Sequence, residues 1–366
     1  MPKIAFTARH DAATKAALID IRAARKECIF SLPAWAARPV VSNLRDVRDE
    51  PVAILYFNVI LTAIPIASAM YAAPASHCFG ALYLVCLYAL FLTRFLVALL
   101  HVTDHKPLFR KGNAFFHLLT ILAVAPLFGV PSGMYPLHHR IMHHVESNGQ
   151  GRDLSSTEQY QRDSVLHFLW YWVRHATAAW LELLLYAGRR RRMGVLLKSA
   201  AAETLYFGIV YMLWRWQPVQ TLWVFILPYI VTSAALMFGN WSQHIFIDPK
   251  GSGSPYAITY NCVACADNAI TFNDGYHIQH HLNSKTHWSD LPKCFLESLE
   301  EHAAQGGLAF MGMSVFEVGM AVFLGRLDVL VDCMLICGGE LSQMSRIELK
   351  AMLRQRLQPV PLAHHK

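Results

Sequence analysis

The sequence contains few charged residues for its length. Asp, Glu, Lys and Arg together make up 16% of the 366 residues, whereas an average soluble domain contains roughly 25%. Apolar residues make up 54% of the chain, and the mean hydropathy is +0.30. This balance excludes an ordinary soluble globular protein and predicts an integral membrane protein with a substantial polar part.

The sequence also contains few cysteines, and it lacks the patterns typical of exported or nucleic-acid-binding proteins. The eight cysteines are scattered, and only Cys262 and Cys265 form a CxxC pair, so no disulfide framework or cysteine-rich zinc site is expected. The net charge is +7, but no basic repeat is interleaved with aromatic residues, and we expect no nucleic-acid partner. Residues 1–45 are rich in Ala and Arg, lack an apolar core and contain acidic residues, which favours neither a signal peptide nor a transit peptide.

Four apolar runs have the length of a membrane-spanning helix, which needs roughly 20 residues. They cover residues 52–73, 79–100, 196–214 and 219–238. A fifth run at 114–135 is broken by Pro and Gly, which indicates a re-entrant or interfacial hairpin or two half-spans. Residues 165–187 are apolar on one side only and predict an interfacial amphipathic helix. Residues 307–337 are apolar but interrupted by charges, so we expect packed cytosolic helices there rather than a fifth span.

The distribution of basic residues predicts the orientation. The connection at 71–78 has no Lys or Arg, and the connection at 215–218 has one. The opposite side carries the run of arginines at 189–192 and Arg45, Arg48, Lys106, Arg110 and Lys111. Basic loops stay in the cytosol, so this side is expected to be cytosolic.

Histidine is concentrated in three clusters on that same side. Nine of the nineteen histidines form box one (His101 and His105), box two (His138, His139, His143 and His144) and box three (His277, His280 and His281). Spacings of three and four residues place imidazoles on one face of a helix, and adjacent pairs can serve two different ions. This spacing favours His139 over His138 as the first ligand of box two. One helical turn apart at the end of the fourth run lie Asn240 and His244.

This density of imidazoles indicates a two-metal site, because unpaired polar rings have no structural reason to recur on one side. Imidazole sites suit Zn, Cu, Fe or Ni, and a catalytic zinc would need only three histidines and a general base. Eight to nine nitrogens for two ions favour iron. The predicted ligands are His101, His105, His139, His143, His144, His244, His277, His280 and His281, together with Asn240 directly or through a water, and His138 as an alternative. We predict no catalytic residues beyond these ligands.

The three boxes, HxxxH, HxxxHH and HxxHH in this order and with these intervening runs, resemble the membrane fatty acid desaturase superfamily. The resemblance covers residues 50–295. The family's third-box region is similar to the stretch from Asn273 to His281, followed by Trp288 to Pro292. In acyl-CoA members, an Asn and a His spaced as Asn240 and His244 complete the metal site. The resemblance implies a non-haem di-iron oxidoreductase of lipid metabolism. It would use O2 and two external electrons to introduce a double bond into a fatty acyl chain, as acyl-lipid or acyl-CoA.

Residues next to the boxes are candidates to support the metal ligands, and the resemblance also implies an electron donor. Asp104, Glu146 and Asp274 lie next to the boxes and are expected to orient the imidazoles. The polar loop at 153–157 is expected to cap the site or to begin a helix. The HxxxHH form of box two is closer to the acyl-lipid and hydroxylase-like branches. No His-Pro-Gly-Gly haem motif is present, so a separate electron donor is implied, either cytochrome b5 with its reductase or a ferredoxin.

Together these patterns predict an all-α integral membrane protein with about four transmembrane helices and a helical cytosolic cap that holds a di-metal site. We expect a cytosolic N-terminal segment at 1–48, a membrane desaturase domain at 49–295 and a cytosolic helical tail at 296–366. The expected location is the endoplasmic reticulum, with the site facing the cytosol and membrane lipids as partners. The alternatives are a hydroxylase or related oxygenase acting on an acyl chain or another apolar natural product and, more remotely, a membrane metal transporter.

Overall fold

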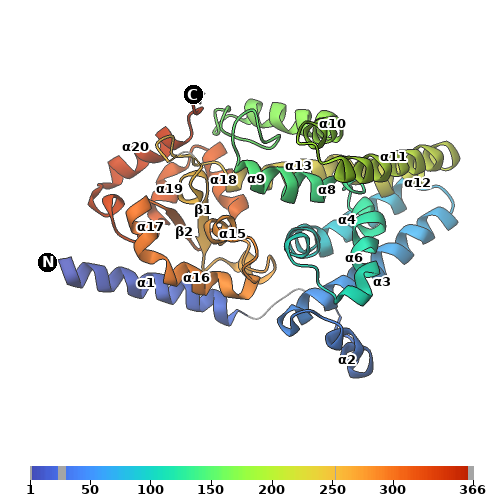
Figure 1. The fold of residues 1–366 in the computed structure, drawn as a ribbon, viewed down its shortest axis with the longest axis horizontal. Coiled ribbons are helices and arrows are strands. Elements are labelled where there is room, and N and C mark those ends of the chain that lie inside the picture. The colour runs from blue at the N-terminus through green and yellow to red at the C-terminus, as the bar shows by residue number, and fades with distance from the viewer. Residues whose placement is uncertain (1, 24–29, 252, 362–366) are drawn as a thin grey trace. The chain divides into compact units, whose positions relative to one another are not determined.

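The computed structural model describes residues 2–23, 30–251 and 253–361 (Figure 1). They form two compact units that interleave along the chain. The first unit contains the described parts of residues 1–25, 143–173 and 237–366, and the second contains those of 26–142 and 174–236. Box two is therefore divided, because His139 belongs to the second unit and His143 to the first. The division into segments 1–48, 49–295 and 296–366 stays a prediction from the sequence.

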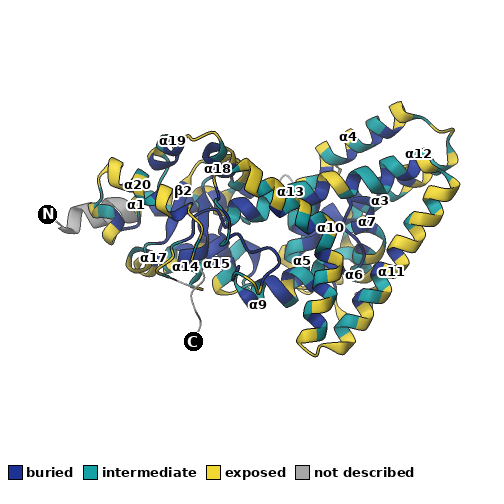
Figure 2. Ribbon diagram, turned by 90° about the horizontal axis from the view of Figure 1, so that it is seen from above, coloured by how far each residue is buried: buried dark blue, intermediate teal, exposed yellow. Residues whose placement is uncertain are grey.

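The second unit is built on long apolar helices. These are α3 (Glu50–Ala72), α4 (His77–Arg94) continued by η2 (Phe95–Val102) and α5 (Thr103–His105), α11 (Met193–Trp216), and α12 (Pro218–Thr221) continued by η6 (Leu222–Ile226) and α13 (Leu227–Gln243). The last part of α13, from Met237, belongs to the first unit. Within the described residues, four helices are long and apolar enough to cross a membrane, which confirms the predicted spans. Large apolar side chains lie exposed along them, including Leu82 and Leu205, as expected where lipid is the solvent. Figure 2 shows exposed positions along α4 and α11.

The broken fifth run forms a hairpin rather than one long helix. Its first leg contains α6 (Ala114–Leu119), η4 (Thr120–Val124) and α7 (Ala125–Leu127), and its second begins with α8 (Met134–Pro136) and η5 (Leu137–His143). The turn between the legs contains Gly129, whose φ is +74°. A Cβ atom at Gly129 would overlap the backbone of Pro228, so glycine is required both by the backbone angle and by the close approach. The predicted amphipathic segment forms α10 (Val165–Arg189), and α2 (Ala34–Ser42) precedes the first span.

The first unit is helical around one small sheet. Strands β1 (Tyr260–Val263) and β2 (Leu308–Met311) pair in parallel, with Tyr260 opposite Leu308. The helices are α1 (Pro2–Arg22), α9 (His144–Glu146), α14 (Pro255–Ile258), α15 (His277–Leu282), α16 (Leu291–Glu297), α17 (Leu299–Gln305), α18 (Val315–Phe323), α19 (Leu327–Asp332) and α20 (Arg346–Arg356). Residues 307–337 thus contain the predicted helices, but they begin with a strand, because buried residues 308–310 continue the hydrogen bonding of β1.

The N-terminal helix α1 is held to the region before box three by one carboxylate. Asp20 is 1% exposed, and it accepts hydrogen bonds from the Ala264 amide at 2.7 Å, from Asn268 Nδ2 at 3.0 Å and from the Tyr276 hydroxyl at 2.7 Å. Small residues of α1, such as Ala13 and Ala17, pack into the same core as Phe295. Charge-assisted bonds to a buried carboxylate are strong, so α1 fixes the chain that leads into His277.

The Gly129 turn gives a direct test of the hairpin. Gly129→Ala is expected to destabilise the protein by about 3 kcal/mol, because it combines overpacking against Pro228 with an unfavourable φ. Gly208→Ala is the matched control, since no atom lies within 4 Å of the Cβ position in α11. A melting temperature for Gly129→Ala equal to that of Gly208→Ala would contradict the turn geometry.

Candidate metal centre

Three imidazoles of the first unit converge on one point. His143 lies at the end of η5, His244 directly follows α13, and His281 lies on α15. One nitrogen from each lies within 4.8 Å of the others, although up to 138 residues separate them in sequence. A ring of nitrogens at this spacing can surround a single metal ion, because imidazole nitrogens bind Zn at about 2.0–2.1 Å.

His244 has the chemistry of a ligand. Its side chain is fully buried, and Nδ1 lies 2.9 Å from the carbonyl oxygen of Ile258, so Nδ1 carries the proton and donates. Nε2 therefore presents a lone pair, yet among the described residues it has no hydrogen-bond partner. Burial lowers the pKa of His244 to about 3, which keeps the ring neutral. A buried lone pair without a donor is costly, and a bound metal ion at Nε2 would satisfy it.

A carboxylate orients His143 in the same way. Asp153 Oδ2 lies 2.7 Å from His143 Nδ1, and both side chains are buried. The Ser155 amide and hydroxyl each donate to Asp153 Oδ1 at 2.8 Å, which fixes the carboxylate. Thr157 of the same loop donates to the His244 carbonyl at 2.7 Å. The loop at 153–157 thus holds two converging histidines, and Asp153 takes a role that sequence reasoning gave to other acids.

The remaining box-three and box-two imidazoles of the first unit surround this group. His280 Nε2 lies 3.0 Å from His144 Nε2, and His281 Nε2 lies 3.2 Å from His277 Nε2. Desolvation and the neighbouring imidazoles lower the pKa of His281 well below its usual range, so this ring is neutral and able to bind a metal.

The side-chain amide of Gln243 links Asp274 to His277 of box three. Gln243 Nε2 donates to Asp274 Oδ2 at 2.9 Å and lies 3.3 Å from His277 Nδ1. Burial raises the pKa of Asp274 to about 7. Glu146, the third acid predicted to support the site, is buried at the end of α9.

A second group of imidazoles lies in the second unit. His101 and His105 at the end of the α4–α5 helix meet His139 of the hairpin, with ring centroids 4.5 Å apart for His101 and His139 and 4.7 Å for His105 and His139. Their nitrogens lie within 4.8 Å of one another. Asp104 Oδ2 lies 3.2 Å from His139 Nδ1, which leaves His139 Nε2 as the atom available to a metal.

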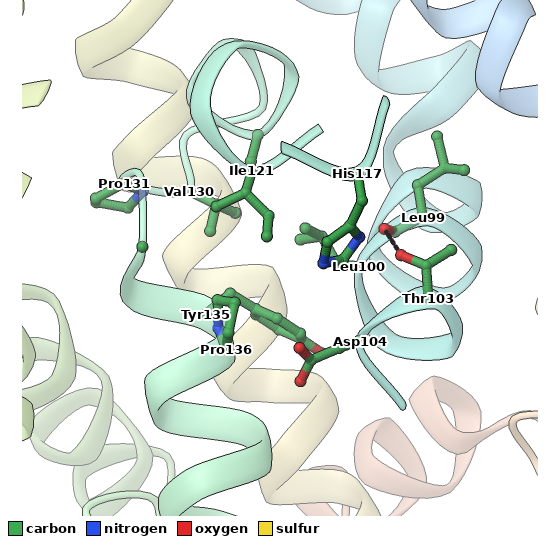
Figure 3. Close-up of a pocket in the computed structure, with 12 residues that line it drawn as sticks. Leu99, Leu100, Thr103, Asp104, His117, Ile121, Val130, Pro131, Tyr135 and Pro136 are labelled. Atoms are coloured by element: carbon green, nitrogen blue, oxygen red, sulfur yellow. Dashed lines mark hydrogen bonds between the residues drawn. The ribbon is translucent and has the colours of Figure 1, made fainter. Parts of the chain in front are cut away.

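A cavity adjoins this second group (Figure 3). Its apolar lining includes Leu99, Leu100, Ile121 and Val130. Asp104, His117 and Tyr135 supply its polar side, and Figure 3 shows the Tyr135 ring extending towards Asp104. The Tyr135 ring also lies 5.1 Å from that of His139. The cavity therefore offers apolar surface next to one group of imidazoles.

Two predicted ligands take other positions. Asn240 Nδ2 donates to the Ser155 carbonyl at 3.0 Å and to the Tyr171 hydroxyl at 2.7 Å, so its amide nitrogen supports the loop that carries Asp153. His138 faces His175, with ring centroids 5.3 Å apart, and it does not join either group of converging nitrogens among the described residues. Their assignment as ligands stays a prediction.

The fold and the two imidazole groups define the class of the protein: a helical protein whose described residues include four helices long and apolar enough to cross a membrane and polyhistidine groups that could hold metal ions. The family "Fatty acid desaturase" matches residues 32–312, and the chain belongs to this family. Comparison with curated proteins and with solved structures gave no significant match.

Removal of the Asp153 carboxylate should weaken metal binding. In Asp153→Asn, His143 loses its charged partner, and metal affinity is expected to fall by roughly 10–100-fold. Titration of the metal-free protein with Fe(II), followed by equilibrium dialysis, measures the effect. Asp163→Asn is the control, since Asp163 is exposed and accepts from Gln161 at 2.6 Å. An affinity unchanged in Asp153→Asn would remove Asp153 from the site.

The two leading histidines of box two provide a second comparison. His139→Ala is expected to lower the metal content of the purified protein by one ion per chain, because His139 is one of the converging imidazoles of the second unit. His138→Ala is expected to retain the full content. Elemental analysis of both variants decides the assignment, and loss of metal from His138→Ala alone would reverse it.

Proposed function

We propose that this protein is an O2-dependent membrane oxidoreductase that introduces a double bond into a fatty acyl chain. The observation that carries this proposal is the pair of imidazole groups, one around His143, His244 and His281 and one around His101, His105 and His139. The membership of the chain in the fatty acid desaturase family supports the lipid substrate. Both desaturation and hydroxylation begin with removal of hydrogen from an unactivated C–H bond, so a hydroxylase is the alternative.

We propose that two iron ions bind to these imidazole groups. When bound, they would supply the activation of O2 and the oxidising power, which amino-acid side chains lack. The protein contributes neutral ligands and their orientation. Asp153 and Asp104 hold the Nδ1 atoms of His143 and His139 at 2.7 and 3.2 Å, so that Nε2 of each ring points away from its carboxylate. The ligand set also includes His144, His277 and His280.

The cavity beside His139 fits a saturated hydrocarbon chain better than a polar substrate. Its lining is mostly apolar and includes Leu99, Leu100, Ile121 and Val130, and burial of each methylene group there stabilises binding by about 0.8 kcal/mol. An apolar wall also excludes water from the neighbourhood of the oxidising centre. We propose that this cavity receives part of the acyl chain, as lipid or as CoA ester.

The location and electron supply complete the proposal. The order of apolar runs in the sequence predicts that basic residues such as those at 189–192 lie on the same side of the spans as the boxes, which supports a cytosolic site, as in the endoplasmic reticulum. Two electrons for each turnover would come from a separate donor, either cytochrome b5 with its reductase or a ferredoxin. An acidic donor would be attracted to this basic side.

Lipid profiling tests the proposed reaction. Yeast that express the unmodified protein should contain an acyl species lighter by two hydrogens, and His280→Ala should lower its amount by roughly 100-fold, the scale expected when an essential ligand is removed. His167→Ala is the control, because His167 is exposed. A product heavier by one oxygen would identify a hydroxylase instead. Identical profiles for the unmodified protein and His280→Ala, at equal protein abundance, would contradict a catalytic role for box three.

A further inference from the structure

Helix α18 has an apolar face that points away from the protein. Phe316, Met320 and Leu324 follow one another at intervals of four residues and are 42%, 47% and 62% exposed. The opposite side of the helix contains Val318, Ala321 and Val322, which are buried. A helix with apolar residues on both faces requires a second apolar environment beyond the core of the protein.

Helix α18 packs closely against the last turns of α13, both through its buried side and through Phe316 at the edge of the exposed face. Phe238 of α13 contacts the rings of Phe316 and Phe323, with centroids 5.3 and 5.7 Å apart. A Cβ atom at Gly319 would overlap the Ser242 hydroxyl, and one at Gly239 would lie 4.0 Å from the Phe316 ring. The absence of a side chain at Gly319 therefore permits the close approach, and α18 is packed against the stretch 238–242.

The length of the span sets the depth of that stretch in a bilayer. The continuous helix from Pro218 to Gln243 has 26 residues, or about 39 Å at ~1.5 Å per residue, whereas the hydrocarbon core is about 30 Å thick. Its apolar run ends at Phe238 and is followed by Asn240, Ser242 and Gln243. The change in polarity places Phe238 at the boundary between hydrocarbon and headgroups. Helix α18, which packs there, must lie at the same depth.

We propose that α18 lies in the membrane interface and inserts Phe316, Met320 and Leu324 among the lipids. The ends of the helix suit this position. Glu317 is held at the N-terminus, where its carboxylate accepts from the Ser314 amide at 2.7 Å, and the exposed Arg326 just beyond the C-terminus can reach lipid phosphates. The proposal rests on insertion of the Pro218–Gln243 helix into the bilayer.

A neighbouring helix presents the same kind of surface. Phe168 of α10 contacts Phe238 and Phe323, with ring centroids 5.5 and 5.8 Å apart. On the outer side of α10, Trp170 is 63% exposed and Leu166 is 76% exposed. Tryptophan is enriched at the boundary between lipid and water. Both helices that touch Phe238 thus carry exposed apolar residues, as a bilayer surrounding this end of α13 would require.

Lipid quenching of a site-specific fluorophore tests the proposal. The full-length protein, with Cys28, Cys78 and Cys86 replaced by serine, is labelled with bimane at Leu324→Cys, Leu82→Cys or Ile347→Cys and reconstituted into phosphatidylcholine vesicles with or without brominated acyl chains. Labelling of the background chain is subtracted. Leu82 is an exposed position on a span, and Ile347 is an apolar residue 82% exposed on α20 of the first unit.

The proposal predicts that brominated lipid lowers the emission at position 324 to roughly half, as for a group within the interface. Brominated lipid should also lower the emission at position 82 and leave the emission at position 347 unchanged. Quenching at 82 with no quenching at 324 would overturn the proposal for α18 while leaving the spans intact. No quenching at 82 would overturn both. Pyrene excimer emission from Leu324→Cys without lipid quenching would assign the face to contact between two copies of the chain.

Discussion

The structure depends on keeping buried imidazoles neutral and aimed at common points. An imidazole that binds a metal through one ring nitrogen usually donates a hydrogen bond from the other nitrogen to a carboxylate or a carbonyl, and this bond fixes the orientation of the ring. Asp153 does this for His143, Asp104 does it for His139, and the Ile258 carbonyl does it for His244. Desolvation favours the uncharged ring, so the same burial that makes an unpaired nitrogen costly also prepares it to bind a metal.

A buried arginine connects the polar loop after box two to distant segments of the chain. Arg162 is fully buried, and its guanidinium donates to the carbonyls of Thr157, Ile245 and Arg356 at 2.9–3.0 Å. Burial lowers the pKa of Arg162 to about 9, so the group remains charged at neutral pH and is compensated by these carbonyls. One side chain thereby connects the loop at 153–157 with the segment after His244 and with the C-terminal helix α20.

The sequence was most informative where a pattern is local. Long apolar runs predicted the four long helices. Histidine spacing predicted the clusters, but His139 and His143, which it placed on one helix face, belong to different groups of converging nitrogens. Asp153 was not singled out as a partner of His143, because ten residues of irregular loop separate them and only the folded chain brings them to 2.7 Å. The pairing of β1 with β2 and the anchoring of α1 through Asp20 also depend on contacts between distant segments. Proline and glycine at 126–133 predicted a break but not the fit of Gly129 against Pro228.

Metal analysis of the unmodified, full-length protein tests the central claim most directly. The purified protein, loaded anaerobically with Fe(II) and dialysed, should retain two iron ions per chain, one for each group of converging imidazoles. Mössbauer spectra should show high-spin ferrous iron with nitrogen ligands and no haem. Retention of a single ion per chain, or of no iron at saturating Fe(II), would contradict an account in which both groups are metal sites.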